Sequence, residues 1–523
     1  MMELLEYVIN SFLSWYIILL AFSALIYWYL TKTFNHWKSR NVCYIEPVIL
    51  FGNLKDRVLF RQSFHEFQLF IYNQFKGNKI AGLYEGRKPT LICLDPNIIR
   101  HILVKDFNHF VDRPTLTFRD SPYIQRMLLN LKGDSWKATR YLMAPAFSSG
   151  KLKAMLGLVQ EVSDQLIDHL HKSIDANGGQ CTGDIQIKDF FGRFTMDVIA
   201  SCAFGVHCDS FKEADSQFVK TISAFSDISL IQRMALLAVL LFFPKLSKFL
   251  KLSFFNMDSI EFLVQVIKDA KKYREDHPNL INNDFLDLMV AAKKAEENGE
   301  PQRNGFYFKE KSMDEETIIA QSVLFLLAGF ETSSTLLTFL SYELALNTDV
   351  QEKLRDEILR VSKNHKGQLS YQALGEMVFL ENVLLETLRK HPPIARIDRI
   401  CTKKYLVPES DVVLEVGDSV SIPAIGLHYD SDFFPDPHKF NPDRFNAEEK
   451  LNRSPYAFLP FGAGPRNCIG IRFATMTTKL VLAQVLKDFR FNKCSKTAVP
   501  YSFSKTSFLL KPENGIWLSI DKV

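Results

Sequence analysis

The sequence has no internal repeat, no low-complexity tract and no Gly/Ser-rich linker, which disfavours a repeat protein or a string of loosely joined domains. It also contains no G-x-G-x-x-G motif, no P-loop and no H-E-x-x-H motif. The chain therefore has no obvious nucleotide-binding half. Its 12 histidines show no ligand spacing, which argues against a zinc hydrolase.

Cysteine is also scarce, with eight residues in 523 and no C-x-x-C pair, so a disulfide scaffold is excluded and reduced thiols are expected. Only one N-x-[ST] sequon occurs, at Asn452, which favours a cytosol-facing protein over a secreted one. The net charge is only +4 and no block of Lys or Arg occurs, so nucleic acid is not an expected partner.

What the sequence does contain begins with a long apolar run, Val8 to Leu30, which holds no charged residue. A membrane span needs roughly 20 such residues, and the apolar core of a cleavable signal is shorter. The run is followed by the basic residues Lys32, Lys38 and Arg40. The positive-inside rule then predicts a single-pass anchor with a lumenal N-terminus and a cytosolic body. A buried helix or an uncleaved signal is the alternative interpretation.

A second apolar run, Met234 to Phe243, is too short to span a bilayer and stops at Pro244. It fits a core helix or a surface element that dips into the membrane equally well.

The rest of the chain is rich in helical patterns, with 47% hydrophobic and 23% charged residues. Helices are predicted over Lys151–Ala176, Asp258–Glu275, Ser312–Leu346, Val350–Val361 and Leu374–Lys390. A capping box at Ser312-Met-Asp-Glu315 is expected to open the longest of them. Short β runs lie near Thr90–Leu94, Val412–Val416 and Ile516–Ile520, and a surface loop is expected over 292–311. We expect a mainly α fold with a minor β region and a single body over residues 48–523, behind an anchor at 1–31 and a linker or hinge at 32–47.

Residues 461–470 carry the most specific pattern, F-x-x-G-x-R-x-C-x-G. A thiolate from Cys468 is the soft anionic ligand that can hold haem iron and push electron density toward bound oxygen. Such a sulfur must be shielded and must receive hydrogen bonds, which glycines at 464 and 470 allow. Phe461 can exclude water, and Arg466 offers a cationic fork for a haem propionate. An inert cysteine in a Gly-rich turn is the alternative.

This segment resembles the haem-binding loop of cytochrome P450, and the resemblance extends over residues 90 to 475. It implies a cytochrome P450-like haem domain with haem b, iron protoporphyrin IX, as cofactor and Cys468 as the metal ligand. The motif Ala328-Gly-Phe-Glu331-Thr332 resembles the family's acid–threonine pair, which relays protons to reduced oxygen. We expect a haem face and bound oxygen to explain Gly329, since glycine costs about 1 kcal/mol in a helix relative to Ala.

Further matches imply scaffold and propionate roles. Glu386-Thr-Leu-Arg389 and, downstream, Arg444 resemble the family's buried ion triad. Trp136-Lys-Ala-Thr-Arg140 is similar to its W-x-x-x-R, and the resemblance makes Trp136, Arg140, Arg399 and, more weakly, Arg113 propionate partners. Arg396 is expected nearer the substrate. The Pro/Gly-rich hinge that usually follows the anchor in microsomal members is reduced here to Tyr44-Ile-Glu-Pro47 and Gly52-Asn53.

The implied activity is a monooxygenase that inserts one oxygen atom from O2 into a lipophilic substrate, xenobiotic or endogenous. Its electrons would come from NADPH through a separate NADPH-cytochrome P450 reductase, with cytochrome b5 as a second candidate partner, at the endoplasmic reticulum membrane. Basic residues such as Lys137 are expected to dock the reductase. Two alternatives stand beside it: a haem–thiolate isomerase or dehydratase acting on a peroxide, and a non-catalytic haem sensor or carrier.

Overall fold

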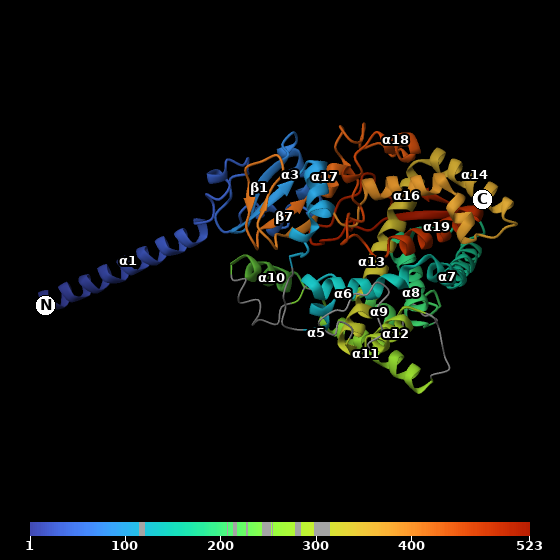
Figure 1. The fold of residues 1–523 in the computed structure, drawn as a ribbon, viewed down its shortest axis with the longest axis horizontal. Coiled ribbons are helices and arrows are strands. Elements are labelled where there is room, and N and C mark those ends of the chain that lie inside the picture. Colours follow the sequence, from blue (N-terminus) through green and yellow to red (C-terminus); the bar gives the residue numbers. More distant parts are fainter. Residues whose placement is uncertain are drawn as a thin grey trace.

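The structure is a computed structural model of the chain, and it describes residues 1–114, 121–206, 208–212, 217–225, 229–242, 253, 255–277, 284–297 and 314–523. One long helix, α1 (Met2–Thr31), projects from a body that holds the other elements (Figure 1). The body is mainly helical with small sheets, as the sequence predicts.

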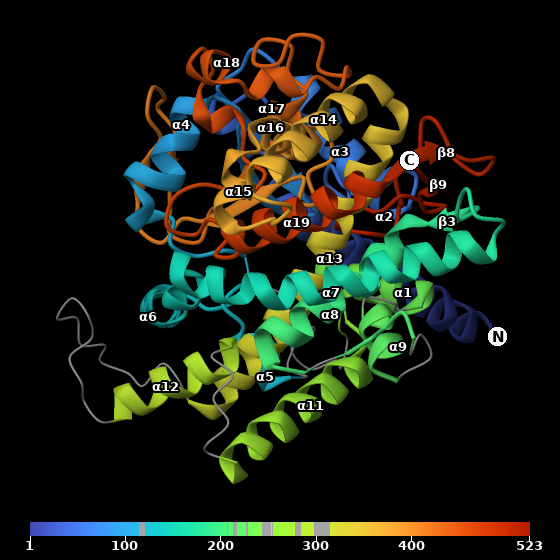
Figure 2. The same ribbon diagram turned by 90° about the vertical axis from the view of Figure 1, so that its right-hand side faces the viewer.

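The longer helices of the body include α6 (Gly133–Met143), α7 (Ser149–Ala176), α8 (Ile187–Phe204), α11 (Met257–Asp276), α13 (Glu315–Leu346), α14 (Thr348–Asn364), α16 (Val378–Lys390) and α19 (Ile471–Asp488). Shorter ones are α2 (Lys55–Val58), α3 (Phe64–Phe75), α4 (Pro96–Arg100), α5 (Pro122–Arg126), α9 (Gln217–Ala224), α10 (Leu230–Phe242), α12 (Phe285–Glu297), α15 (Tyr371–Glu376), α17 (Ala424–His428) and α18 (Ala447–Leu451). Figure 2 shows α7 and α8 crossing the body between α11 and α12 on one side and α14 to α17 on the other.

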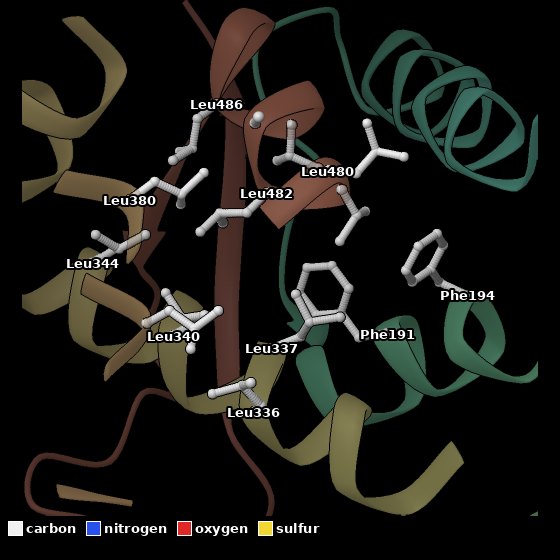
Figure 3. Packing of buried hydrophobic residues seen from close by; sticks show 14 of the residues in the cluster. Phe191, Phe194, Leu336, Leu337, Leu340, Leu344, Leu380, Leu480, Leu482 and Leu486 are labelled. Atoms are coloured by element: carbon white, nitrogen blue, oxygen red, sulfur yellow. The ribbon is translucent and has the colours of Figure 1, made fainter. Parts of the chain in front are cut away.

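Helix α13 is the central element and contacts α8, α14, α16 and α19. Its Leu336, Leu337 and Leu340 meet Phe191 from α8 and leucines from α19 in the largest apolar cluster (Figure 3). Burying each such side chain stabilises the fold by about 1.5–3 kcal/mol. A helix that is apolar on every face, as this one is, can be stable only with partners all round.

The first residue of α13 differs from the predicted one because a different side chain caps the helix. Asp314 accepts a hydrogen bond from the Thr317 N–H at 2.9 Å, and Arg126 pairs with Asp314 and Glu316. The helix therefore begins at Glu315, and Ser312 of the expected capping box lies outside the described residues.

Two other helical predictions need correction. The single helix expected over Leu374–Lys390 is two helices, α15 and α16, separated at Met377, whose φ of −81° and ψ of 81° are not helical. The loop expected from residue 292 begins later, because α12 continues to Glu297, and 298–311 lies outside the described residues.

The minor β part contains one four-stranded sheet in the order β1 (Ile80–Glu85), β2 (Lys88–Cys93), β7 (Ser419–Ile422), β4 (Ile397–Ile400). A three-stranded sheet joins β3 (Ile185–Gln186), β9 (Trp517–Lys522) and β8 (Phe489–Lys493), and β5 (Tyr405–Leu406) pairs with β6 (Val413–Leu414). Antiparallel pairing of β4 with β7 sets Arg399 opposite Val420.

In the part of the chain that the structure describes, two helices are long and apolar enough to cross a membrane, but their surroundings differ. None of the apolar window of α1 is buried, whereas 67% of that of α13 is buried inside the body. Helix α13 is therefore a core helix, and α1 is the candidate membrane anchor.

Helix α10 carries the second apolar run and is neither wholly buried nor wholly exposed. Leu236 is buried, whereas Ile231 and Met234 are exposed. Figure 1 shows α10 on the side of the body from which α1 leaves. Phe243 and Pro244 lie outside the described residues.

The segment after α1 is held to the four-stranded sheet by Trp37. Its indole N–H donates to the Leu83 carbonyl at 3.1 Å, and a Cβ on Gly82 would lie 2.4 Å from the Trp37 ring. Only glycine at position 82 therefore allows the ring to lie flat against β1. Val42 is also buried here, so the chain is fixed to the body only a few residues beyond α1.

We expect Trp37→Ala to lower the free energy of unfolding by about 3–5 kcal/mol, because it removes a fully buried indole and leaves a cavity. The measurement is the urea unfolding midpoint of the detergent-solubilised protein. Trp517→Ala is the control, since Trp517 is only partly buried on β9 and should cost less than half as much. Equal losses in the two variants would contradict the assignment.

Candidate active site

The turn that carries Cys468 lies directly before α19. The Cys468 N–H donates to the Phe461 carbonyl at 2.9 Å, and the Asn467 N–H donates to the Gly464 carbonyl at 3.0 Å. Gly464 has a φ of +71°, and a Cβ there would lie 1.8 Å from the Leu103 carbonyl oxygen. Glycine is therefore required at position 464. At Gly470 a Cβ would make only an ordinary contact with Phe147, at 3.9 Å.

The Cys468 side chain is solvent-accessible, yet protein atoms surround it densely enough that burial raises the pKa of its thiol. The two observations agree when the sulfur faces an enclosed space within the protein that is large enough for a water molecule. Its contact with the Gly470 N–H and the charges of Arg140 and Arg113 act the other way and lower the thiol pKa. These three groups favour the thiolate form.

Ala328 is a second accessible position within the body. It is exposed in the middle of α13, between the buried Leu327 and Phe330. Its neighbour Gly329 has a different environment from the expected one, because a Cβ there would lie 2.4 Å from the Ile199 side chain of α8. Close packing of α8 on α13 therefore explains this glycine, and the accessible residue is Ala328.

Four arginines converge on the Cys468 turn. Arg113 donates to the Arg466 carbonyl at 3.0 Å, and Arg140 donates to the backbone and side-chain oxygens of Asn467 at 3.0 and 2.9 Å. Arg466 donates to the Leu131 carbonyl at 2.6 Å and lies 4.3 Å from the Trp136 ring centre. The predicted propionate partners thus lie around one turn, with Arg399 close enough to Arg113 and Arg466 to be affected by their charges.

This group of arginines has little negative charge to balance it. Arg399 is 1% exposed and donates only to the Asp398 carbonyl, so its Nε and one terminal nitrogen have no protein partner. Among the described residues, the one carboxylate within 4.0 Å of these guanidinium groups is Asp112, at 3.9 Å from Arg466. Burial and the neighbouring arginines lower the pKa of Arg466 to about 9 and that of Arg399 well below its usual value.

Arg396 is held differently. Its guanidinium pairs with Glu85 of β1 at 2.6 Å and with Asp398 at 3.0 Å. Its charge is therefore neutralised by carboxylates of the sheet. Arg396 is bound to them and is not free to face a substrate.

Glu331 and Thr332 lie one turn beyond Ala328 on α13. The Thr332 hydroxyl donates to the Ala328 carbonyl at 2.7 Å. The Glu331 carboxylate pairs with Lys188 of α8 at 3.1 Å. Thr332 is thus beside the accessible stretch of α13, whereas the acid is bound to the neighbouring helix.

Glu386, Arg389 and Arg444 form a buried cluster under the turn. The Arg389 fork binds both Glu386 oxygens at 2.7 and 2.8 Å, and Arg444 Nε lies 3.4 Å from Glu386 Oε1. Asn441 adds a backbone N–H at 2.9 Å. The carboxylate is therefore paired and hydrogen-bonded, as a buried charge requires.

His428 connects this cluster to the Cys468 turn, a role that no motif in the sequence indicated. Arg389 donates to the His428 carbonyl at 2.9 Å, and the His428 Nε2 accepts from the Leu459 N–H at 2.9 Å. Burial and the Arg389 charge lower the pKa of His428 to about 3, so the ring is neutral and can accept. Leu459 is two residues before Phe461. Lys188 is the other residue that the sequence did not single out, because its partner Glu331 is far away along the chain.

Comparison with known proteins agrees with this arrangement. The sequence model of the family "Cytochrome P450" matches residues 44–519. The chain is 38% identical to "Cytochrome P450 9e2" of Blattella germanica, over 94% of this chain and 95% of that protein. It is 36% identical to "Probable cytochrome P450 6a14" of Drosophila melanogaster, over 94% and 96% of the two chains, and 35% identical to "Cytochrome P450 6k1" of Blattella germanica, over 97% and 96%. A turn that exposes one cysteine among four arginines, under a family match that spans the body, shows that this chain belongs to the cytochrome P450 family of haem–thiolate monooxygenases.

Proposed function

We propose that this monooxygenase inserts one oxygen atom from O2 into a small lipophilic substrate and receives its electrons from NADPH through a separate NADPH-cytochrome P450 reductase. The observation that carries the proposal is an accessible Cys468 beside Arg399 and Arg466, whose buried guanidinium groups keep nitrogens without a protein partner. The described residues supply no flavin or nicotinamide site motif, so the electrons have to come from a partner.

The residues around Cys468 fit haem b, iron protoporphyrin IX. Buried guanidinium groups without anions cost free energy, and two propionate carboxylates would compensate them. Arg399, Arg466, Arg113 and Arg140 would hold these carboxylates, beside Trp136. Cys468 would be the iron ligand, and Phe461 and the glycines at 464 and 470 would enclose its sulfur. When bound, a thiolate-ligated haem supplies reductive activation of oxygen.

The protein's part in catalysis is to shield the ligand and to move protons. Gly470 donates its N–H toward the sulfur, and such hydrogen bonds tune a thiolate ligand. We assign Thr332 to proton delivery, since its hydroxyl lies one turn from the accessible Ala328. Glu331 is the adjacent acid that would supply the proton. Glu386, Arg389 and Arg444 act as scaffold.

Two other functions use the same haem site. A peroxide isomerase or dehydratase would need neither oxygen nor a reductase, and a haem sensor or carrier would not turn over at all. The intact Glu331–Thr332 pair favours the monooxygenase over both. Product formation without NADPH would support the isomerase, and ligand binding without NADPH consumption would support the sensor.

We further propose the endoplasmic reticulum membrane as the location, with α1 as a single-pass anchor and the body in the cytosol. Residues 1–31 would be the anchor, 32–47 the linker and 48–523 the catalytic domain. Helix α10, which exposes Ile231 and Met234, lies on the side from which α1 leaves, and this suits contact with membrane lipid (Figure 1). Reductase, and cytochrome b5 if it takes part, would then meet the body from the cytosolic side.

The first test is the carbon monoxide difference spectrum of the reduced protein, for wild type and Cys468→Ser. We expect the strongly red-shifted band of thiolate-ligated haem in wild type, and its loss in the variant, because serine cannot supply the sulfur ligand. A band typical of histidine ligation in wild type, or no haem at all, would overturn the proposal.

The fit of the arginines can be tested with Arg399→Met. Without cofactor this change removes an uncompensated buried cation, so we expect the thermal midpoint of the haem-free protein to stay equal or rise. With cofactor it removes a propionate partner, so haem should dissociate about tenfold faster, as expected for a lost hydrogen bond to a charged group. The two measurements are a thermal melt and haem transfer to a scavenger protein.

Arg396→Met is the matched control for Arg399→Met. Arg396 is paired with Glu85 and Asp398, so its loss should destabilise the haem-free protein without changing the rate of haem dissociation. If both variants destabilise the haem-free protein equally and neither releases haem faster, the arginine assignment is wrong.

Docking of the reductase can be tested at Lys137, which forms an i,i+3 pair with Asp134 on α6. We expect Lys137→Ala to reduce the rate of reductase-supported turnover about threefold at low salt, with the difference shrinking as salt screens the charge. Lys212→Ala is the control, since Lys212 forms the same kind of pair with Asp209 elsewhere. Equal reductions of the turnover rate in the two variants would contradict the assignment of Lys137 to reductase docking.

A further inference from the structure

Lys188, the second residue of α8, is the feature of the molecule that the proposed chemistry leaves unexplained. Its side chain is 15% exposed, and its ammonium group makes all of its described contacts with α13. The nitrogen lies 3.1 Å from Glu331 Oε1, 3.0 Å from the Glu331 carbonyl oxygen, 2.9 Å from Ser334 Oγ and 2.7 Å from Thr335 Oγ1. One cation therefore holds both the side chain and the backbone of the proposed relay acid.

The charge balance shows how closely the two residues depend on each other. Burial lowers the pKa of Lys188, and the Glu331 carboxylate is the largest influence that raises it again. Two further charges affect the pKa of the ammonium group: Lys511 lowers it and Asp189 raises it. Among the described residues Lys188 is the one cation within 4.0 Å of the Glu331 carboxylate, which is itself only 16% exposed. Removing either partner would leave the other half-buried and unpaired.

The stretch of α13 next to this contact has unusual backbone hydrogen bonding. The carbonyl oxygens of Ala328, Phe330 and Glu331 each accept a hydrogen bond from a side chain, in addition to their place in the helix. The Thr332 side chain donates to the Ala328 carbonyl, and those of Ser334 and Thr195 donate to the Phe330 carbonyl. The side chains of Lys188 and Thr335 donate to the Glu331 carbonyl. Such bonds weaken the helical ladder and often bend helices. The contact with Lys188 thus lies in a stretch of α13 where side chains share the backbone carbonyl oxygens.

We propose that Lys188 is the positioning residue for Glu331: it holds the carboxylate and the backbone carbonyl of Glu331 against α8, and thereby sets how protons reach Thr332. Successive residues of a helix point about 100° apart. The side of α13 that carries Glu331, Ser334 and Thr335 faces Lys188. Thr332 lies on the same side of α13 as Ala328, one turn away. This inference rests on the proposed monooxygenase function, since it assigns a role within that reaction.

The first test does not depend on turnover. In Lys188→Met the carboxylate loses its counter-ion in a half-buried place, so we expect it to take up a proton at neutral pH. Infrared spectroscopy of the resting haem-loaded protein should then show a new protonated-carboxyl band that is absent from wild type. The band should disappear in Lys188→Met combined with Glu331→Gln, which identifies its source, and Lys188→Arg should show no band.

The second test measures turnover with reductase and NADPH. We expect Lys188→Met to reduce product formation about tenfold and to divert electrons to hydrogen peroxide; this loss is smaller than the roughly 10²–10⁴-fold contribution of a general acid, because Lys188 acts through Glu331. In a Glu331→Gln background the same change should have no further effect. Lys188→Arg should retain most of the activity, because it keeps the cation.

The matched control is Lys271→Met. Lys271 is a lysine of α11 that is 13% exposed and pairs with Glu315 at the start of the same helix, α13, at 3.0 Å. Its carboxylate partners Glu315 and Glu275 are more than half exposed, so its loss should lower stability less than the loss of Lys188, without the infrared band and without more peroxide.

Additive losses in the double variant, no new infrared band in Lys188→Met, or equal peroxide release in Lys271→Met would each overturn the role of Lys188. If wild type itself does not turn over with reductase while the infrared result holds, the monooxygenase proposal fails and the Lys188–Glu331 contact does not.

Discussion

The ion pair between Glu386 and Arg389 is the interaction on which the position of the Cys468 turn depends. Both side chains are fully buried, and the fork of Arg389 satisfies the two carboxylate oxygens at once. The same guanidinium binds the His428 carbonyl, and the His428 ring fixes the backbone N–H of Leu459. An unbroken set of hydrogen bonds therefore runs from α16 to the residues that lead into the turn. Breaking such a buried pair costs about 3–5 kcal/mol, far more than a surface pair contributes.

The protein contains a second group of buried charges that is built in the opposite way. Around Glu386 two guanidinium groups share one carboxylate, and both of its oxygens accept hydrogen bonds, so protein groups alone supply the anion of this cluster. Around Cys468 the guanidinium groups of Arg399 and Arg466 lie close together with nitrogens that have no protein partner. A fold tolerates repulsion of this kind where a ligand compensates it. The two clusters differ in their anion: Glu386 lies against its arginines, whereas the carboxylate of Asp112 lies 3.9 Å from Arg466, and this difference supports the proposed cofactor site.

The parts of this arrangement that the sequence could predict are those whose residues are close together along the chain. The motif around Cys468 and the long apolar run of α13 are local, and both lie where expected. The expected capping box misplaced the start of α13, because Asp314 could be recognised as the cap only together with Arg126. The break between α15 and α16 was missed although Gly375 stands two residues before Met377, because a single glycine inside a helical pattern does not by itself end a helix.

Other features depend on contacts between distant segments, and no pattern within one segment could reveal them. Gly329 was attributed to a ligand because the sequence does not show that Ile199 of α8 fills the space beside it. Lys188 and Glu331 lie on different helices, and neither residue type is unusual where it occurs. Ordinary residues acquire a role here only when two helices bring them together.

The two long apolar helices show the same dependence on partners most clearly. By length and composition α1 and α13 are equivalent, since either could cross a bilayer. They differ in what covers them: α13 is enclosed by α8, α14, α16 and α19, whereas α1 has no protein over its apolar window. An isolated apolar helix in water would expose all of this surface, at about 25 cal/mol for each Å². A lipid bilayer would remove this cost for α1, just as the protein body removes it for α13. The proposed anchoring of α1 in lipid would also bring α10, which exposes Ile231 and Met234, to the membrane surface, so one physical requirement would account for both surfaces.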